Sequence, residues 1–399
     1  MTTTYDITII GAGIVGSALA CALAPSGQRI LLLDQKAPAL SWPEDSTDMR
    51  VSAITLASMR IFQHLRVWDT IQALGISPFQ HMRVWDQAGT GEVQFHGSEL
   101  GQPVLGHIIE NRVMQKSLIE SLKNHSNVTC NFDCTLEDVN FQTLHTSKGV
   151  IRSTLIVGAD GGRSWLREKV GFAINSMDYE QHALVATIQC EKPHKNTAWQ
   201  RFTPTGTLAF LPLADPHRVS IVWSTTAEQA DALKTLDETH FNAQLAEAFE
   251  HRLGKTTLQS PRAVFPLTMR HAVDYVKPGF ALVGDAAHTI HPLAGQGVNL
   301  GLLDAACLAE TLEHALQSRR DIADLFTLKK YQRWRKHHNA LMIKSMRGFQ
   351  RLFASQRLPL KLLRNWGLDF TNNTWLLKSL FMQHAAGLKG DLPNAALLK

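Results

Sequence analysis

The chain has 399 residues, 44% of them hydrophobic and 19% charged, a composition that fits a soluble globular protein of two or three domains. Its five scattered cysteines argue against a disulfide scaffold and against a complete zinc site, and they favour a reducing cytoplasm. The net charge of +5 is uneven, because residues 329–399 hold 14 Lys and Arg but two Asp, and no apolar run is long enough for an expected membrane span.

The first predicted elements are a strand, a tight turn, a helix and a second strand in residues 5–35, "YDITIIGAGIVGSALACALAPSGQRILLLDQ". Gly11 permits the turn, Gly13 lets a pyrophosphate approach the backbone, and Gly16 lets the helix pack closely on the strand. Asp34 ends the second strand about 20 residues later, where a ribose hydroxyl is held in such folds. The pattern predicts a dinucleotide site, with a glycine-rich turn in an unrelated α/β unit as the alternative, and it suits NAD and FAD equally.

A second stretch, "LIVGADGGRSWLREKVG" in residues 155–171, has the same strand, turn and helix design. Asp160 and Gly161 lie in the turn, and Ser164 is placed to cap the helix. Taken alone, this stretch is an ordinary connection between a strand and a helix.

An inserted second domain is predicted between this stretch and the next one. Residues 182–226 alternate apolar and polar side chains over short runs, as half-buried antiparallel strands do. We expect most of their apolar residues to be plain core. The candidates for the wall of an aromatic pocket are Phe202, Phe210, Leu211 and Leu213.

The third stretch, "VGDAAHTIHPLAGQGVNLG" in residues 283–301, joins an acid, a proline and four glycines directly before a predicted helix. Asp285 can accept hydrogen bonds from cofactor hydroxyls, and Pro292 fixes the loop. The helix that begins near Val298 offers free N–H groups and a positive dipole end. A reduced flavin is anionic around its N1 and C2 carbonyl, so this helix start favours a flavin.

Other classes of site are less consistent with the motifs. A metal at His288 and His291 lacks a third ligand beyond Asp285, so packing or hydrogen bonding of the two His is favoured. No second G-x-G-x-x-G indicates a separate nicotinamide domain, and no C-x-x-C or C-x-x-x-x-C pair indicates a disulfide-reducing flavoenzyme.

The basic C-terminal region has two open interpretations. Residues 347–367, "RGFQRLFASQRLPLKLLRNWG", mix apolar residues with bases as an amphipathic helix at an anionic bilayer does. Equally, such helices can pack on the cofactor domain and point solvated bases outward. Nucleic-acid binding is not expected, because no recognition fold accompanies the charge.

Together the three stretches, in this order, resemble those of the FAD-dependent aromatic hydroxylases of the para-hydroxybenzoate hydroxylase type. The segments "MRVSAITLAS", "GHIIENRV", "AFLPLADPHRVSIVWS", "FPLTMRHA" and "AAGLKGDLP" are similar to the bacterial ubiquinone-biosynthesis hydroxylases, most of all the 2-polyprenylphenol hydroxylases. The resemblance implies a FAD-dependent monooxygenase that takes NAD(P)H and O2 and hydroxylates a polyprenylphenol ring through a flavin C4a-hydroperoxide. The alternatives are a sister hydroxylase acting later on the same ring and a FAD-dependent lipid reductase.

The resemblance also implies an α/β fold, in which a Rossmann-like FAD-binding domain carries an inserted, mainly antiparallel β-sheet substrate domain and C-terminal helices. The FAD-binding parts are expected at 1–75, 103–176 and 271–330, the substrate domain at 76–102 and 177–270, and the basic helical region at 331–399. A polyprenylated substrate implies a cytoplasmic enzyme with peripheral contact at the inner membrane face and with other ubiquinone-biosynthesis proteins. A non-enzymatic alternative is an assembly subunit that keeps FAD structurally.

Cofactor contacts follow from the resemblance residue by residue, and no metal ligand is among them. Gly11, Gly13, Gly16 and Asp34 would hold the ADP half. Arg50 lies near the cofactor in the family, and Asn111 stands where the family usually has Arg or Gln. The remaining contacts are Asp160, Gly161, Gly284, Asp285, Gly295, Gln296, Gly297, Val298 and Asn299, with Pro292 as the candidate that aligns the phenol for catalysis.

Overall fold

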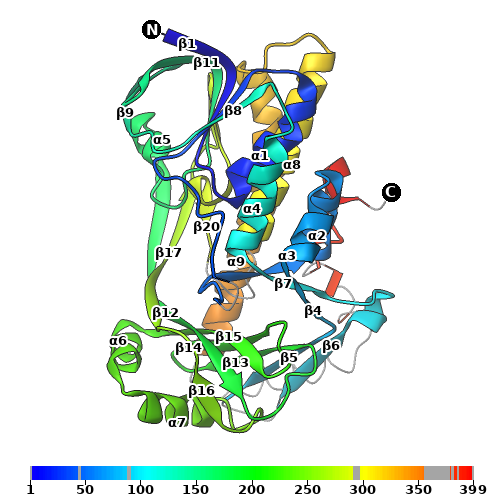
Figure 1. The fold of residues 1–399 in the computed structure, drawn as a ribbon, viewed down its shortest axis with the longest axis vertical. Helices are drawn as coiled ribbons and strands as arrows, with labels where there is room; N and C mark the ends of the chain where they lie inside the picture. Colours follow the sequence, from blue (N-terminus) through cyan, green and yellow to red (C-terminus); the bar gives the residue numbers. More distant parts are fainter. Residues whose placement is uncertain are drawn as a thin grey trace.

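The computed structural model describes residues 2–43, 46–87, 91–290, 297–354, 378, 382–383 and 386–397. These residues form two units, one above the other in Figure 1: an upper unit built on a mainly parallel sheet and a lower unit built on an antiparallel sheet. The long strands β12 (Ile174–Cys190) and β17 (Ala263–Ala272) run from the upper unit into the lower one. The predicted α/β fold class is confirmed.

The upper sheet brings the carboxyl ends of five parallel strands, β19, β11, β1, β2 and β8, to one edge. Its strands, in order, are β18 (Val276–Lys277), β19 (Phe280–Leu282), β11 (Gly149–Gly158), β1 (Thr2–Ile10), β2 (Ile30–Leu33) and β8 (Val128–Asn131), with β10 (Thr143–Thr146) and β9 (Leu136–Asn140) extending from β11. The register aligns Ile10 with both Leu33 and Gly158, and Gly158 with Leu282. The segments that follow β1, β2, β11 and β19 therefore emerge side by side, where ligands bind in open α/β sheets.

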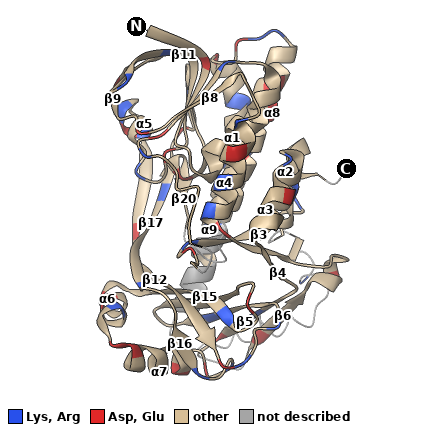
Figure 2. Ribbon diagram, in the orientation of Figure 1, with Lys and Arg blue, Asp and Glu red and all other residues tan. Residues whose placement is uncertain are grey.

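Helices α1 (Ile14–Leu23), α4 (Asn111–Leu122) and α8 (Gly297–Gln317) lie side by side against this sheet (Figure 1). The long helix α9 (Leu325–Ala354) packs against α8. Shorter helices are α2 (Leu56–His64), α3 (Trp68–Leu74) and α5 (Trp165–Lys169). The core between sheet and helices is apolar. Figure 2 marks the charged residues, which are spread along both units. Among the described residues, no helix combines the length and the hydropathy needed to cross a bilayer.

The lower sheet is antiparallel apart from one parallel pair, β13 with β5. In order its strands are β20 (His288–Thr289), β17, β12, β15 (Arg218–Thr226), β14 (Gly206–Pro212), β13 (Thr197–Thr203), β5 (His81–Asp86) and β6 (Glu92–His96), with β16 (Thr256–Leu258) beside β12. Helices α6 (Ala227–Thr235) and α7 (Glu238–Ala248) pack on its outer face.

The two faces of the lower sheet correct the predicted pocket wall. Side chains alternate along β14, so Leu208 and Phe210 point to the outer face, where Phe210 stacks on Phe249 with ring centroids 3.7 Å apart. Phe210 is therefore outer core rather than pocket wall. Leu211 and Leu213 instead pack toward the upper unit. Phe202 lies in β13, on the same face as Ala198, which belongs to that inner cluster.

A small third sheet lies between the two units. It consists of β3 (Val51–Thr55), β7 (Gly106–Glu110) and β4 (Ser77–Phe79). Its Phe79 and Ile108 form the inner apolar cluster with Leu211 and Leu213. This cluster joins the small third sheet to the inner face of the lower sheet. Figure 1 shows β4 and β7 between the two units.

Candidate active site

Of the three glycines in the first motif, Gly13 has room for a Cβ, whereas Gly11 and Gly16 do not. Gly11 has a φ of +106°, and a Cβ there would lie 2.4 Å from the Ala159 carbonyl oxygen. A Cβ on Gly16 would lie 1.9 Å from the Gly11 carbonyl oxygen, so α1 packs directly on the turn. A Cβ on Gly13 would meet nothing within 4 Å. The open space lies over the start of α1, whose first N–H groups have no partner within the helix and suit a pyrophosphate.

Asp34 and Gln115 hold the backbone of this turn. One carboxylate oxygen of Asp34 accepts the Ala12 N–H at 2.7 Å, and the other accepts the Lys36 N–H at 3.1 Å. A carboxylate has capacity for further donors, so ribose hydroxyls fit beside these bonds. Gln115 of α4 donates its side-chain N–H to the Ala12 carbonyl at 2.7 Å. The sequence analysis did not identify Gln115, since nothing in its local pattern marks it.

The second motif presents a buried acceptor that lacks a donor. Asp160 Oδ2 accepts the Leu166 N–H at 3.1 Å, whereas Oδ1 is buried without a hydrogen-bond partner among the described residues. Burial raises the pKa of Asp160, although hydrogen bonds from Ser164 and Leu166 work in the opposite direction. Gly161 follows with a φ of +81° and open space where a Cβ would stand. The orphaned oxygen at the edge where the strands end is consistent with a ligand that supplies a hydroxyl or an amide.

Arg167 joins the second motif to the third. Its guanidinium donates to the Ala286 carbonyl at 2.9 Å and to the Gly162 carbonyl at 2.8 Å. Burial lowers the pKa of Arg167, and the nearby carboxylate of Asp160 raises it. The sequence placed this residue on the helix after the motif but did not assign it a role.

The backbones at the start of the third motif contact both the first and the second motif. Gly284 has a φ of +59°, and a Cβ there would lie 3.2 Å from Val15 of α1. A Cβ on Gly301 of α8 would lie 2.6 Å from a Val15 methyl and 3.2 Å from the Gly284 Cα. The first and third motifs are therefore in direct contact, and the Val283 N–H bonds to the Gly158 carbonyl of the second motif at 2.9 Å.

Asp285 lies in the short turn after β19, close to the start of α8, in a partly enclosed position. Its side chain is exposed, yet the protein around it removes enough water to raise its pKa, while His288, Arg50 and Arg270 counteract that rise. A Cβ on Gly297 would lie 4.0 Å from Asp285 Oδ1. An exposed carboxylate with this desolvation is what a cleft produces, and it is available to cofactor hydroxyls.

Arg50 and Asn111 are joined by one backbone hydrogen bond. The Asn111 N–H bonds to the Arg50 carbonyl at 2.9 Å, and the Asn111 side chain accepts the Ser52 hydroxyl at 2.7 Å. Arg50 extends over the ring of Phe265, with its guanidinium carbon 5.8 Å from the centroid. In the position where the family usually has a longer donor, Asn111 thus binds within the chain and fixes α4 to β3.

Asn299 anchors the beginning of α8. Its side-chain oxygen accepts the Thr55 N–H at 3.0 Å, and its side-chain N–H donates to the Ala53 carbonyl at 2.8 Å. Val298 beside it is half-buried. The other predicted residues of this loop lie outside the described residues: His291, Pro292, Gly295 and Gln296.

A buried polar network behind the site was not foreseen from the sequence. Asp304 of α8 accepts the Gly284 N–H at 3.1 Å, Arg335 Nε at 2.8 Å and Asn339 Nδ2 at 3.1 Å, and it also bonds to His288. Burial alone would raise the pKa of Asp304, but His288 and Arg335 outweigh it, so that pKa is lowered. Within the described ranges no set of three His, Cys, Asp or Glu is arranged for a metal, and His288 binds Asp304 instead.

The chain matches known flavoproteins along nearly its whole length. The model of the FAD binding domain family matches residues 4–345. A 3-demethoxyubiquinol 3-hydroxylase of Escherichia coli is 38% identical over 96% of this chain and 98% of that protein. The human mitochondrial ubiquinone biosynthesis monooxygenase COQ6 is 33% identical over 96% of this chain and 93% of that protein.

Solved structures share the fold. PqsL of Pseudomonas aeruginosa in complex with 2-aminobenzoylacetate has a TM-score of 0.78 at 22% identity, over 92% of this chain and all of that one. The p-nitrophenol 4-monooxygenase PnpA of Pseudomonas putida has a TM-score of 0.79 at 17% identity, over 98% of this chain and 99% of that one. The open space at Gly13 and the orphaned Asp160 oxygen fit FAD. The chain therefore belongs to the FAD binding domain family, as a flavin-dependent aromatic monooxygenase that uses FAD and NAD(P)H and is related to the ubiquinone-biosynthesis hydroxylases.

Proposed function

We propose that this monooxygenase hydroxylates the ring of a prenylated phenol or quinol in ubiquinone biosynthesis. The observation that carries the proposal is the 38% identity, over 96% of the chain, to an enzyme named for hydroxylating 3-demethoxyubiquinol. The inner apolar cluster below the strand ends supports it, because a prenylated ring needs an apolar surface from which water is excluded.

Two ring steps compete within this proposal. The sequence segments resembled the 2-polyprenylphenol hydroxylases most, whereas the 38% relative is named for a later intermediate. We take the later intermediate, a 3-demethoxyubiquinol, as the first substrate to test and the polyprenylphenol as the second. Both are electron-rich phenols, so the same site chemistry serves either one.

The chain's own residues prepare the site for this chemistry. Bound FAD would supply hydride acceptance and the activation of O2. Asp34 and the open turn at Gly13 would hold the ADP half, Asp285 the ribityl hydroxyls, and the amide end of α8 the electron-rich side of the ring. The apolar residues Met269, Ile290, Leu300 and Ile343 form a second cluster beside the start of α8, which limits water near the reacting ring. Pro292, which lies outside the described residues, remains our candidate for aligning the phenol.

Product analysis tests the reaction. The purified holoenzyme is given NAD(P)H, isotopically labelled O2 and a short-chain demethoxyquinol or 2-alkylphenol, and the product is weighed by mass spectrometry. We expect one labelled oxygen in the ring product. Consumption of NAD(P)H with a reduced, unlabelled lipid would instead identify a FAD-dependent lipid reductase.

Lipid analysis of a deletion strain identifies the step. The quinone precursor that accumulates is the substrate of the missing enzyme, and we expect the 3-demethoxy intermediate. Restored quinone synthesis by a variant that binds no flavin would favour the assembly-subunit alternative. As part of the same proposal, the enzyme works peripherally at the inner membrane face, alongside other ubiquinone-biosynthesis proteins, because a polyprenyl tail partitions into the bilayer.

A further inference from the structure

Helix α9 carries an unbalanced positive charge on its outer side. The 30 residues from Leu325 to Ala354 contain no Asp or Glu. The inner side is buried and includes Tyr331, Arg335 and Asn339. The outer side is exposed and is called here the α9 outer face; it comprises Phe326, Lys329, Lys330, Arg333, Leu341 and Lys344. These positions follow helical spacing and form one continuous strip along the axis.

The α9 outer face holds four bases: Lys329, Lys330, Arg333 and Lys344. Within the part of the chain that the structure describes, none of the four forms an ion pair, although Lys330 lies 5.7 Å above the ring of Phe326. By contrast Arg335, on the inner side, is paired with Asp304. The nearby Asp324 accepts the Phe326 N–H at 2.9 Å and so stays at the helix start. The four bases therefore spread positive charge over about 22 Å of the helix, from Lys329 to Lys344, at 1.5 Å per residue.

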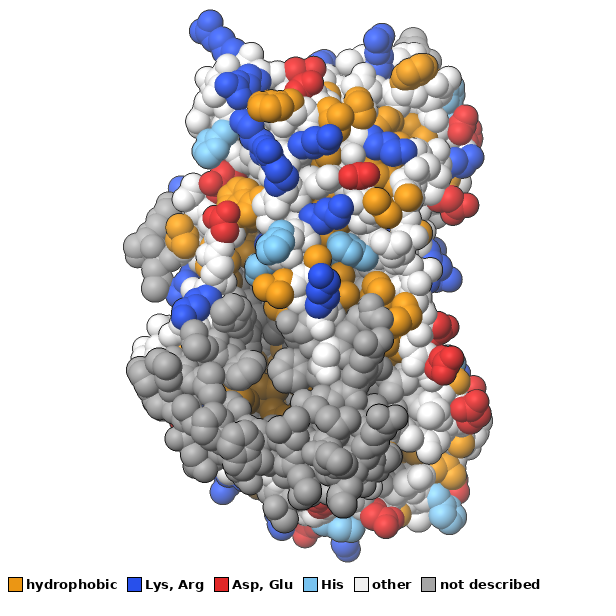
Figure 3. Space-filling view, turned by 180° about the vertical axis from the view of Figure 1, so that it is seen from behind, with side chains coloured by type: hydrophobic (Ala, Val, Ile, Leu, Met, Phe, Trp, Pro, Cys, Tyr) orange, Lys and Arg blue, Asp and Glu red, His pale blue; other side chains and the backbone are white. Residues whose placement is uncertain are grey.

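Two large apolar side chains mark the ends of the same face. Phe326 is 63% exposed and Leu341 is 53% exposed, which is unusual for such residues. They stand about 22 Å apart along the helix. Figure 3, the view from behind, shows basic, acidic, His and hydrophobic side chains mixed over the upper half of the molecule.

We propose that the α9 outer face docks on an anionic lipid bilayer, with the helix axis parallel to the membrane surface. The row of bases along the helix attracts anionic head groups. The exposed side chains of Phe326 and Leu341 can enter the boundary between head groups and acyl chains. A soluble polyanion would use the cations but would have no need of the two apolar residues. This separates a lipid surface from nucleic acid or an acidic protein.

The inner flank of the same helix reaches toward the site. Ile343 and Met342 pack in the apolar cluster with Met269, Ile290 and Leu300, beside the start of α8. A prenyl tail bound there would lie next to the helix that faces the bilayer. This link to the substrate rests on the proposed function, whereas the docking itself does not.

Vesicle flotation of the FAD-loaded full chain tests the surface. Vesicles of phosphatidylglycerol with phosphatidylethanolamine are compared with pure phosphatidylcholine vesicles. The variant Lys330→Gln/Arg333→Gln/Lys344→Gln should bind the anionic vesicles about 100-fold more weakly, at about five-fold per base. Added salt should weaken binding of the wild type, because exposed charges are screened.

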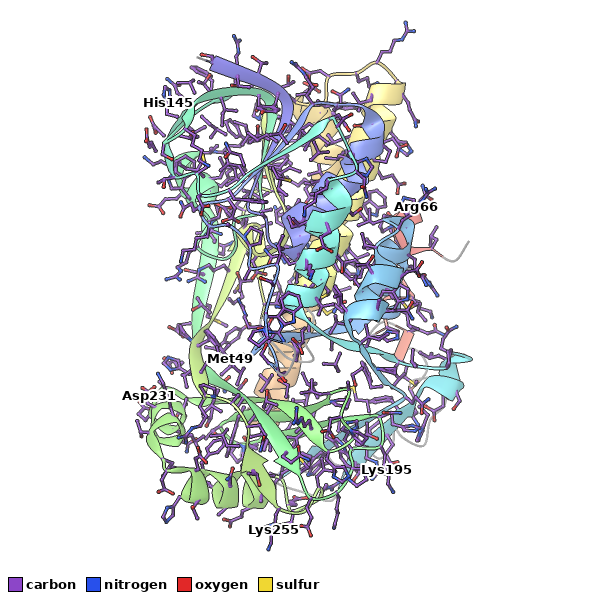
Figure 4. The ribbon with its side chains drawn as sticks, in the orientation of Figure 1. Met49, Arg66, His145, Lys195, Asp231 and Lys255 are labelled. Atoms are coloured by element: carbon purple, nitrogen blue, oxygen red, sulfur yellow. The ribbon has the colours of Figure 1, made fainter. Side chains whose placement is uncertain are left out.

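A charge-matched control changes three bases at the far end of the lower unit, as Lys192→Gln/Lys195→Gln/Lys255→Gln. Figure 4 labels Lys195 and Lys255 there, away from α9. The control should bind as the wild type does. Equal loss in both triple variants, or no preference for anionic vesicles, overturns the proposal.

A second variant separates lipid from other polyanions. Phe326→Ser/Leu341→Ser keeps the charge and should still reduce vesicle binding several-fold, whereas unchanged binding overturns the lipid assignment. Turnover of a short-chain, water-soluble phenol is measured in parallel, and all variants should keep it. If the wild type binds vesicles but forms no hydroxylated product, the proposed function fails and the docking surface stands.

Discussion

The Asp304 carboxylate and the Arg335 guanidinium form an ion pair at 2.8 Å in which neither side chain is exposed. Asp304 comes from α8 and Arg335 from α9, and Asp304 also accepts the N–H of Gly284, the residue before Asp285. The pair thus connects the third cofactor motif to a helix that begins 40 residues after Asp285.

Removal of one partner of this pair should destabilise the protein strongly. Arg335→Met leaves a buried carboxylate with less compensation, which costs about 3–5 kcal/mol in comparable cases. Chemical denaturation of the FAD-free protein measures the free energy of unfolding. Arg333→Met, an exposed position on the same helix, is the control and should change it by no more than about 0.5 kcal/mol. Equal effects of the two changes would show that the buried pair carries no special stability.

The buried imidazole of His107 should make stability fall in mild acid. Its ring lies 5.0 Å from the Trp68 ring, and burial lowers the pKa of His107 to about 4. In the unfolded chain the pKa is about 6.5, so below that pH the unfolded chain binds a proton that the folded one does not. Stability is therefore full above about pH 6.5 and is lost as the pH falls toward 4.

Urea denaturation at pH 7 and pH 5 measures this loss. At pH 5 the contribution of His107 is about 2 kcal/mol, and His107→Leu should remove that much of the pH dependence. The exposed His145, labelled in Figure 4, serves as the control, and His145→Asn should leave the wild-type pH dependence intact. A pH dependence in His107→Leu that is as large as in the wild type contradicts the assignment; a smaller one is expected to remain, because burial also lowers the pKa of His271.

Two glycines of the first motif should respond to the same substitution in different ways. Gly13→Ala adds a methyl group in open space, so the FAD-free protein should keep its stability within about 0.5 kcal/mol while FAD binding falls, because the methyl group stands where the pyrophosphate approaches. Gly16→Ala adds a methyl group 1.9 Å from the Gly11 carbonyl oxygen, so the fold itself should be destabilised. Thermal denaturation without FAD and fluorescence titration with FAD distinguish the two outcomes. Normal FAD affinity in Gly13→Ala would refute the cofactor position.

Substitutions of two neighbouring residues of β14 should have different effects, one on stability and the other on substrate binding. Phe210 is fully buried against Phe249 on the outer face, so Phe210→Ala should cost about 3–5 kcal/mol of stability without a specific change in KM. Leu211 lies on the inner face, so Leu211→Ala should raise KM for a prenylated substrate more than for a short phenol. Steady-state kinetics with both substrates gives the comparison. If Phe210→Ala raised KM and Leu211→Ala did not, the substrate would bind on the outer face, and this prediction would be wrong.

The glycine turns of the site were predictable because each one is set by residues that are close together in the sequence. The turn at Gly11 needs a positive φ, and Gly16 allows no Cβ, so both constraints are visible in a short run of sequence. That the three motifs lie close together also follows, since parallel strands end at a common edge. Alternation along β14 predicted two faces but not which one meets the cofactor unit, and Phe210 was assigned to the wrong face for that reason.

The long-range contacts were not predictable from the sequence alone. Asp304 is separated from Arg335 by 31 residues, and no spacing rule relates an acid on one helix to a base on the next. Arg167 contacts the Ala286 carbonyl across 119 residues, and a backbone acceptor has no sequence signature at all. Each depends on the packing of whole elements, which a single sequence does not specify at the level of individual atoms.

The hydrogen bonds that link Gly284 through Asp304 to Arg335 affect how amino-acid substitutions in α9 should act on flavin binding. A substitution in α9 that loosens Asp304 also loosens the loop that grips the flavin, although it lies outside every recognised motif. Because a ligand that binds the folded form stabilises it by mass action, a higher intracellular flavin supply should offset such a lesion. Defects in this helix should therefore respond to riboflavin, whereas defects in residues that contact the phenol should not.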